Sequence, residues 1–153
     1  MNGKPTAGFS LLELLAVLVL LGLLASHAGL RFGFGGATLP AQADQLAADL
    51  RHAQGLAMQL ARRLRLETTG GGYRVVDVAA SAPITDPATQ QPFTVALENG
   101  VTLAGGPVTF DSLGRPVDAG GLAATAVDFV LAADGRSRTV RVRPVSGLAE
   151  VVP

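Results

Sequence analysis

The sequence contains no cysteine and no tryptophan, and aromatic residues make up 5% of its 153 residues. Without cysteine the chain has no disulfide scaffold, no cysteine nucleophile and no thiolate for a metal ion. Charged residues amount to 16% and the formal net charge is zero, so the basic excess of a general nucleic-acid binder is missing. Apolar residues reach 48%, which excludes a disordered chain and predicts one modest domain plus a hydrophobic anchor.

Catalytic motifs are also missing. No glycine-rich phosphate loop ending in Gly-Lys-Ser or Gly-Lys-Thr occurs, and no serine stands near a histidine in a nucleophile motif. The two histidines, His27 and His52, have no acidic or histidine neighbours at the spacing of metal ligands. We interpret both as polar residues facing solvent or the membrane interface. We therefore expect a protein that is not an enzyme, with no catalytic residues, no metal site and no cofactor.

The N-terminal segment is the most informative part of the chain. Residues 1–8 are polar and carry one positive charge, Lys4, and a mostly apolar run then extends from residue 9 to residue 30. That run holds about 22 residues, close to the ~20 that a helix needs to cross a bilayer. Positive charge before the run predicts a cytoplasmic N-terminus and a single transmembrane helix. The rest of the chain is then expected in the bacterial periplasm, outside the inner membrane.

Glu13 distinguishes three interpretations of this segment: an ordinary signal peptide, a plain signal anchor, and a segment that assembles with copies of itself. A carboxylate inside a hydrophobic run costs about 2.5–3.5 kcal/mol on insertion scales. Neither a discarded signal peptide nor a plain anchor has a reason to carry a carboxylate at that cost. If the chain is cut before Phe9, however, the new amine lies one helical turn from Glu13, and pairing of such charges offsets their burial.

The hexapeptide from Gly8 to Glu13, Gly-Phe-Ser-Leu-Leu-Glu, resembles the motif of type IV prepilins. The resemblance implies that a prepilin peptidase cleaves residues 1–8 as a leader between Gly8 and Phe9. It further implies that the amine of Phe9 is methylated. In this family Glu13 is expected to help place each subunit in a helical filament.

A helix and a breaker are expected to connect the anchor to the rest of the chain. Residues 31–40 are rich in glycine and end in a proline, so we expect the N-terminal helix to be interrupted near 29–40. Residues 41–66 then read as an amphipathic helix that packs on a β domain. Its apolar stripe recurs at steps of three and four and consists of Leu46, Leu50, Ala53, Ala57, Leu60 and Leu64.

Residues 67–153 are expected to form a β-rich globular domain, because the apolar periodicity there changes to two. Residues 79–92 hold three prolines and read as a surface loop available for partner contacts. The predicted fold class is therefore α+β: a pilin-like architecture with a long N-terminal hydrophobic helix and a C-terminal antiparallel β domain. Strands are expected over residues 64–68, 73–78, 93–97, 101–103, 108–110, 127–132 and 139–142.

One hairpin can be predicted with its register. The dipeptide Asp-Gly at 134–135 suits a two-residue type I′ turn. This turn places Phe129 opposite Val140 on one face of the sheet, and Asp128 opposite Arg141 on the other. Apolar residues then share one face and opposite charges meet on the other face, as a half-buried sheet requires.

Two further segments resemble the GspH/FimT group of minor pseudopilins and minor pilins. Residues 108–116, Val-Thr-Phe-Asp-Ser-Leu-Gly-Arg-Pro, are similar to the group's phenylalanine, turn and Gly-Arg-Pro signature, and residues 46–66 are similar to its passage from helix to first strand. The resemblance implies a minor pseudopilin of the type II secretion pseudopilus, acting by assembly at the filament tip in protein secretion. Its implied partners are prepilin peptidase, other minor pseudopilins or pilins, the inner membrane through 9–30, and secreted cargo.

Two alternatives stay open. Residues 135–138, Gly-Arg-Ser-Arg, resemble an element of DNA-binding FimT proteins, so Arg136 and Arg138 are candidate DNA contacts in natural transformation. The expected hairpin register sends these two arginines to one face and Arg141 and Arg143 to the other, which favours ordinary exposed arginines over a single phosphate groove. The other alternative is a minor pilin that primes a pilus.

Overall fold

The computed structural model of the chain describes Leu15, Val17, Val19 and residues 38–152. The chain divides into two compact units, Met1–Gly35 and Gly36–Pro153, and the fold below is that of the second unit. Leu15, Val17 and Val19 are helical, with exposed side chains. Within the described ranges, no helix is both long and apolar enough to cross a membrane.

The described domain begins with one helix, α2 (Leu39–Leu60), which follows Thr38 in extended conformation. Pro40 lies in the first turn, where the missing amide hydrogen breaks no intrahelical hydrogen bond. The helix ends at Ala61, whose left-handed backbone (φ 51°) lets the amide of Arg62 donate to the carbonyl of Ala57 at 3.1 Å. The buried face of α2 consists of Gln42, Ala43, Leu46, Ala47, Leu50, Ala53, Leu56 and Ala57.

Two antiparallel sheets follow the helix. The larger sheet has the strand order β3-β2-β1-β6-β7-β8, and β4 pairs with β2 beside β3. Its strands are β1 (Leu64–Thr69), β2 (Gly72–Asp77), β3 (Ala82–Pro83), β4 (Thr94–Ala96), β6 (Val108–Phe110), β7 (Pro116–Asp118) and β8 (Gly121–Leu122). The smaller sheet has the order β11-β10-β9-β5. Its strands are β5 (Thr102–Gly105), β9 (Val127–Ala133), β10 (Arg136–Val142) and β11 (Ala149–Val152).

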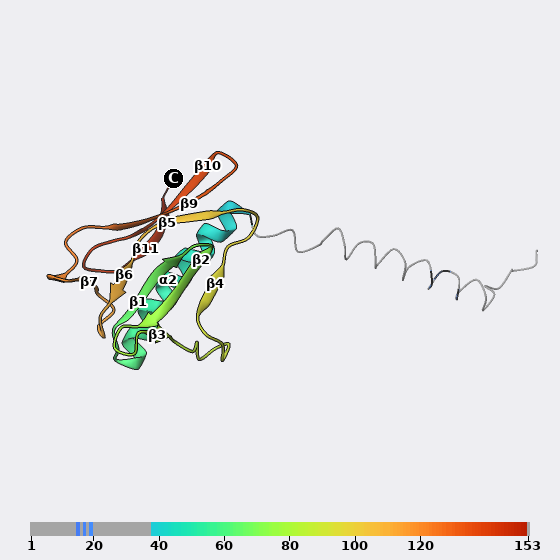
Figure 1. Cartoon of the computed structure of the whole chain (residues 1–153). Coiled ribbons are helices and arrows are strands. Elements are labelled where there is room, and N and C mark those ends of the chain that lie inside the picture. The colour runs from blue at the N-terminus through green and yellow to red at the C-terminus, as the bar shows by residue number, and fades with distance from the viewer. Residues whose placement is uncertain (1–14, 16, 18, 20–37, 153) are drawn as a thin grey trace, which may run out of the picture. The chain divides into compact units, whose positions relative to one another are not determined.

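Helix α2 packs against strands of both sheets, β1 and β6 of the larger one and β9, β10 and β11 of the smaller one. Figure 1 shows α2 lying along β1. The small side chains on its buried face let the helix approach both sheets closely, and larger side chains from the strands fill the space between them. The largest of those fully buried strand residues are Tyr73, Phe110, Phe129, Leu64, Leu66 and Leu131.

The predicted register of the β9–β10 hairpin is confirmed. Phe129 pairs with Val140, and Asp128 pairs with Arg141. Asp134 and Gly135 have φ values of 51° and 70°, so both turn residues adopt the positive φ that a type I′ turn requires. The alternation of the two faces fixed this register, because a slip by one residue would turn every core side chain outward.

The structure departs from the sequence-based expectations at element ends and in short strands. The helix predicted over 41–66 begins at Leu39 and ends at Leu60, since the chain turns at Ala61 and enters β1 at Leu64. Pro40, expected in the breaker of 31–40, therefore belongs to the helix. Residues 79–92 contain strand β3 and a bridge between Thr85 and Pro92. Strands β7, β8 and β11 also lie where the sequence predicted no strand.

Candidate functional site

The residues with the strongest sequence-based predictions are the cleavage pair Gly8 and Phe9 and the assembly residue Glu13. All three lie outside the described residues, so their roles stay predictions. His27 lies outside them as well.

The signature segment 108–116 folds into a turn organised by Asp111. One carboxylate oxygen, Oδ1, accepts hydrogen bonds from the amides of Leu113 and Arg115, both at 2.9 Å. The other oxygen, Oδ2, accepts two from the guanidinium of Arg115, at 3.0 and 2.8 Å. Burial alone would raise the pKa of Asp111, but these hydrogen bonds outweigh it and hold the pKa below its ordinary value. The turn therefore depends on an ionised aspartate.

We expect Asp111→Ala to lower the free energy of unfolding by about 2 kcal/mol at neutral pH, because two amides and one guanidinium lose their acceptor. A depressed native pKa adds stability above the ordinary aspartate pKa of about 4, and that stability is lost as pH falls through the native value. The difference in unfolding free energy between wild type and variant should thus become smaller at acidic pH. Urea titrations of the full chain at several pH values measure it. Asp44→Ala, at an exposed position of α2, is the control, and a difference independent of pH would contradict the argument.

Gln54 of α2 connects this turn to a second one. Its side-chain amide donates to the carbonyl of Gly114 at 2.7 Å and to the carbonyl of Ser146, in the turn between β10 and β11, at 2.8 Å. The two turns approach so closely that a Cβ atom on Gly147 would lie 2.9 Å from the oxygen of Gly114. One helical side chain thus holds the β6–β7 and β10–β11 connections together.

Two further polar contacts attach α2 to the larger sheet. The buried hydroxyl of Tyr73 donates to Asp49 at 2.5 Å, and burial raises the pKa of both groups above their ordinary values. His52 lies 3.2 Å from Asp86, and its ring lies against Phe93 with the centroids 5.6 Å apart. His52 is part-exposed, and its acidic partner comes from a loop 34 residues away, where no local sequence spacing could indicate it.

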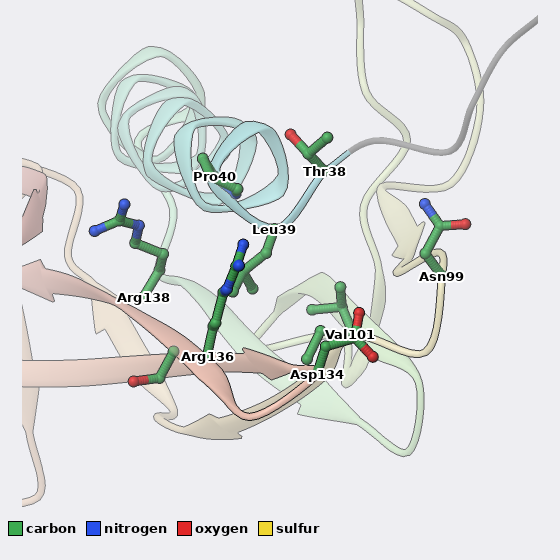
Figure 2. Close-up of a pocket in the computed structure, with 10 residues that line it drawn as sticks. Thr38, Leu39, Pro40, Asn99, Val101, Asp134, Arg136 and Arg138 are labelled. Carbon is green, nitrogen blue, oxygen red and sulfur yellow. The ribbon is translucent and has the colours of Figure 1, made fainter.

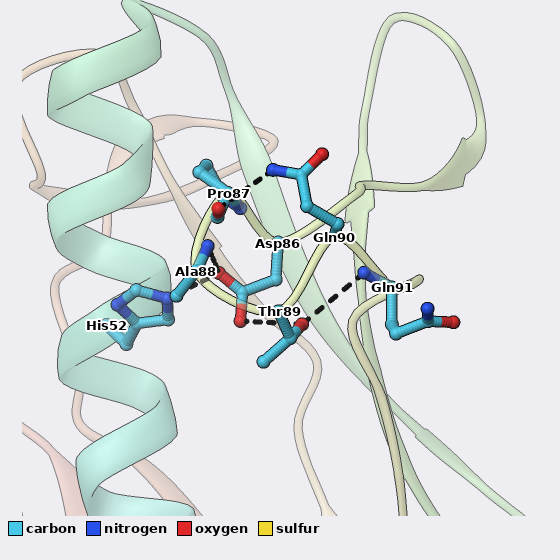
Figure 3. A network of polar contacts seen from close by, with 7 residues as sticks. All are labelled: His52, Asp86, Pro87, Ala88, Thr89, Gln90 and Gln91. Carbon is cyan, nitrogen blue, oxygen red and sulfur yellow. Dashed lines mark hydrogen bonds and ion pairs between the residues drawn. The ribbon is translucent and has the colours of Figure 1, made fainter.

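Figure 3 shows that Asp86 also organises its own loop. Its carboxylate accepts hydrogen bonds from the amide of Ala88 at 3.0 Å and from the hydroxyl of Thr89 at 3.2 Å. The amide of Ala88 is the largest cause of a lowered pKa at Asp86, and the contact with His52 adds to it. The segment predicted as a surface loop is thus tied to α2. Within the described residues no three potential metal ligands gather, there or elsewhere.

The arginines of β10 and Arg143, which directly follows the strand, divide by face, as the register predicted. Arg141 forms a two-pronged ion pair with Asp128, at 2.8 and 2.7 Å, and Arg143 pairs with Glu150 at 2.7 Å. Arg136 and Arg138 lie on the other face, are exposed, and form no ion pair with any described residue. The two candidate DNA contacts are thus brought together, while their neighbours are neutralised.

Arg136 and Arg138 border a pocket of about 780 Å³, which we call the hairpin pocket. Figure 2 shows Arg136 extending from β10 toward Leu39 in the first turn of α2, with Arg138 beside it and its guanidinium turned away from Arg136. The hairpin pocket is lined by Thr38, Leu39, Pro40, Asn99, Val101, Ala133, Asp134, Arg136, Ser137 and Arg138. The sequence placed the two arginines on one face, but it held no signal that the first turn of α2 would complete a pocket with them.

The domain consists of an α-helix packed on two antiparallel sheets, and an apolar run precedes it in the sequence. Known families share these features. A model of the family described as Type II transport protein GspH matches residues 42–146, which is more than half of the chain. The chain belongs to the GspH family. A model of the prokaryotic N-terminal methylation motif matches residues 3–26 as well. The predicted membership of the GspH/FimT group is confirmed.

Solved structures agree with the GspH assignment at the level of the fold. Two crystal forms of the type IV minor pilin FimU of Pseudomonas aeruginosa strain PAO1 match with a TM-score of 0.55 and 20% identity. Each covers 75% of this chain, and the match covers 88% of one FimU chain and 93% of the other. The predicted pilin-like α+β fold is confirmed. Among curated proteins, none matches the chain.

Membership of the GspH family also fixes the general character of the protein. The family and the matched fold are those of structural pilin subunits, which are anchored in the membrane by an N-terminal helix. The methylation motif implies processing by a prepilin peptidase and partners of the pilin type. The contacts of Gln54, Asp49 and His52 agree with this character, since each joins α2 to another segment of the domain.

Proposed function

We propose that this chain is a minor pseudopilin of a type II secretion system, and that it acts by assembly at the tip of the pseudopilus. The match of the GspH family over residues 42–146 carries the proposal, because it covers α2 and almost the entire β domain. The methylation motif over residues 3–26 supports the same conclusion from the other end of the chain. The proposed partners are other minor pseudopilins and secreted cargo.

The proposed mechanism begins at the N-terminus. Prepilin peptidase cuts between Gly8 and Phe9 and methylates the new amine, and residues 9–30 hold the subunit in the inner membrane with its C-terminal domain in the periplasm. During assembly the carboxylate of Glu13 pairs with the amine of Phe9 on a neighbouring subunit, which offsets the cost of both charges in an apolar bundle. The rigid β domain then presents its surface to the other tip subunits.

An experiment in the source bacterium tests the proposal. Deletion of the gene is expected to stop export of type II substrates, and the wild-type gene is expected to restore it. Glu13→Leu should reduce incorporation into the filament about 100-fold or more, because it leaves the amine of Phe9 buried without a counter-charge, at about 3–5 kcal/mol. Secreted protein in the medium and subunit in sheared filaments are the two measurements.

Ser10→Ala is the matched control, since it changes a polar side chain in the same segment without touching a charge. Full incorporation of the Glu13→Leu chain would refute the role of Glu13. Normal secretion after deletion, combined with loss of pili, would instead favour a minor pilin that primes a pilus. Normal secretion with loss of natural transformation would favour the DNA-uptake alternative.

The second candidate function, DNA binding by a FimT-like minor pilin, is favoured by one observation. Arg136 and Arg138 lie together on the hairpin pocket, exposed and without ion-pair partners among the described residues. Phosphodiester groups are natural ligands for such a pair.

A further inference from the structure

The hairpin pocket carries a local excess of positive charge. Arg136 and Arg138 contribute two guanidinium groups, and Asp134 is the one carboxylate among the described residues that line the pocket. Figure 2 shows Asp134 on the Val101 side of Arg136, with Arg138 beyond Arg136 on the opposite side. The first turn of α2 adds no acidic residue. The pocket thus has the charge to receive an anion.

The contrast along β10 strengthens this interpretation. Arg141 and Arg143, on the opposite face of the strand, are matched by Asp128 and Glu150 at 2.7 Å. If Arg136 and Arg138 were ordinary exposed arginines, a carboxylate on the neighbouring strand could pair with each of them as well. The two arginines on the hairpin pocket are left with five donors each and without a carboxylate acceptor among the described residues.

The position of the pocket in the chain limits what can reach it. Thr38, which lines it, is the eighth residue after Leu30, the end of the predicted membrane segment. A fully extended chain of that length spans at most about 28 Å, and a helix about 12 Å. While the subunit is anchored, Thr38 at the edge of the pocket therefore lies within that distance of Leu30.

We propose that the hairpin pocket binds the phosphate group of an anionic phospholipid headgroup, on the outer surface of the membrane that anchors the subunit. Arg136 and Arg138 donate to the phosphate oxygens, and the apolar side chains of Leu39 and Val101 cover the glycerol. The contact holds the globular domain against the bilayer until the subunit is extracted into a filament. The proposal depends on the membrane anchoring of the family and not on the choice between secretion and pilus machines.

Duplex DNA contains the same phosphodiester group, but the pocket suits it less well. A volume of about 780 Å³ accommodates one headgroup and not a duplex, and among the described residues that line the pocket none is aromatic, so none offers a face for base stacking. Asp134 at the rim repels a continuous phosphate backbone more than a single phosphate. The anchored chain, moreover, is always within reach of lipid phosphates.

The absence of cysteine allows a direct test with the mature full-length chain in nanodiscs. Thr102→Cys, at an exposed position of β5 opposite Ala132 and outside the pocket lining, carries a fluorophore, and a nitroxide on lipid headgroups quenches it when the hairpin lies on the surface. We expect stronger quenching in discs that contain phosphatidylglycerol than in discs of phosphatidylcholine alone. Arg136→Gln with Arg138→Gln should lower the ratio of docked to undocked chain about fivefold for each arginine removed.

Two controls accompany this test. Arg51→Gln with Arg63→Gln removes the same charge from exposed positions on and just after α2 and should leave the quenching unchanged. A fluorophore at Ala80→Cys, near the opposite end of the 22-residue helix, should be quenched less, since the helix is about 33 Å long. Salt at 1 M, where the Debye length is about 3 Å, should release the hairpin.

Equal quenching in the two kinds of disc, or quenching that survives the double substitution at Arg136 and Arg138, would overturn the proposal. So would a short DNA duplex that displaces the hairpin from phosphatidylglycerol discs at low salt and binds in an arginine-dependent manner. That last result would assign the pocket to DNA. None of these outcomes depends on secretion, so failure here leaves the proposed function intact.

Discussion

A Gly8→Val chain is expected to keep its leader completely. The peptidase has to bring its reacting groups against the carbonyl of residue 8, and glycine allows a closer approach than any residue with a side chain. Valine adds two branches on Cβ at this point and restricts the backbone to extended conformations. The intact mass of the membrane-extracted protein measures the outcome, since residues 1–8 and the methyl group on Phe9 change it together.

Ala7→Val is the matched control, because it introduces the same side chain one residue earlier. That chain should be processed, although more slowly. Accumulation of a mature, methylated Gly8→Val protein would rule out cleavage between Gly8 and Phe9. The unprocessed chain has a second expected defect: no amine is freed at Phe9, so Glu13 lacks its proposed partner, and the subunit should be absent from filaments even though it is inserted in the membrane.

The β9–β10 hairpin shows which features of the fold the sequence could predict. Its register follows from local information alone: a two-residue turn and strict alternation of apolar and charged residues on either side of it. The end of α2 shows the opposite. The apolar stripe continues in sequence through Leu60 to Leu64, so periodicity predicts a longer helix, yet Leu64 is buried as the first residue of β1. Ala61 in a left-handed conformation gives no recognisable signal, because alanine is not the residue usually found there.

The polar contacts of the site were less predictable for a related reason. Gln54 reaches a carbonyl 92 residues away, and His52 reaches an aspartate 34 residues away. Such pairs depend on how the two sheets are placed around α2, and no sequence spacing encodes that. The hairpin pocket is similar, since its arginines could be assigned to one face, whereas the first turn of α2 that completes it comes from the other end of the domain.

The strand β11 (Ala149–Val152) illustrates a third kind of failure. It has four residues, one of them charged, and too few alternations to be distinguished from a loop. It forms because β10 offers an unpaired edge, to which it bonds with Val142 opposite Ala149. Pairing at a sheet edge depends on the tertiary fold, so no local pattern of hydrophobic residues predicts this strand.

The signature phenylalanine, Phe110, is expected to be the most damaging position for truncation in the described domain. Its side chain is 0% exposed, and it pairs with Leu64 on one side and Pro116 on the other. Phe110→Ala should lower the free energy of unfolding by about 3–5 kcal/mol, because it removes the buried ring and leaves a cavity that the surrounding strands close only in part. The total free energy of unfolding of a small domain is about 5–15 kcal/mol, so this single substitution removes a large part of it.

Thermal unfolding of the full chain in detergent measures the effect, and we expect the midpoint to fall by roughly 10–20 °C. Leu113→Ala, three residues further along the same signature, is the matched control. Leu113 is 65% exposed, so its truncation should change stability by less than about 0.5 kcal/mol. If both substitutions lowered the free energy of unfolding equally, core packing would not explain the phenylalanine of the signature. If Phe110→Ala is destabilising while Leu113→Ala instead impairs secretion, the exposed end of the turn becomes the part of the signature that contacts other subunits.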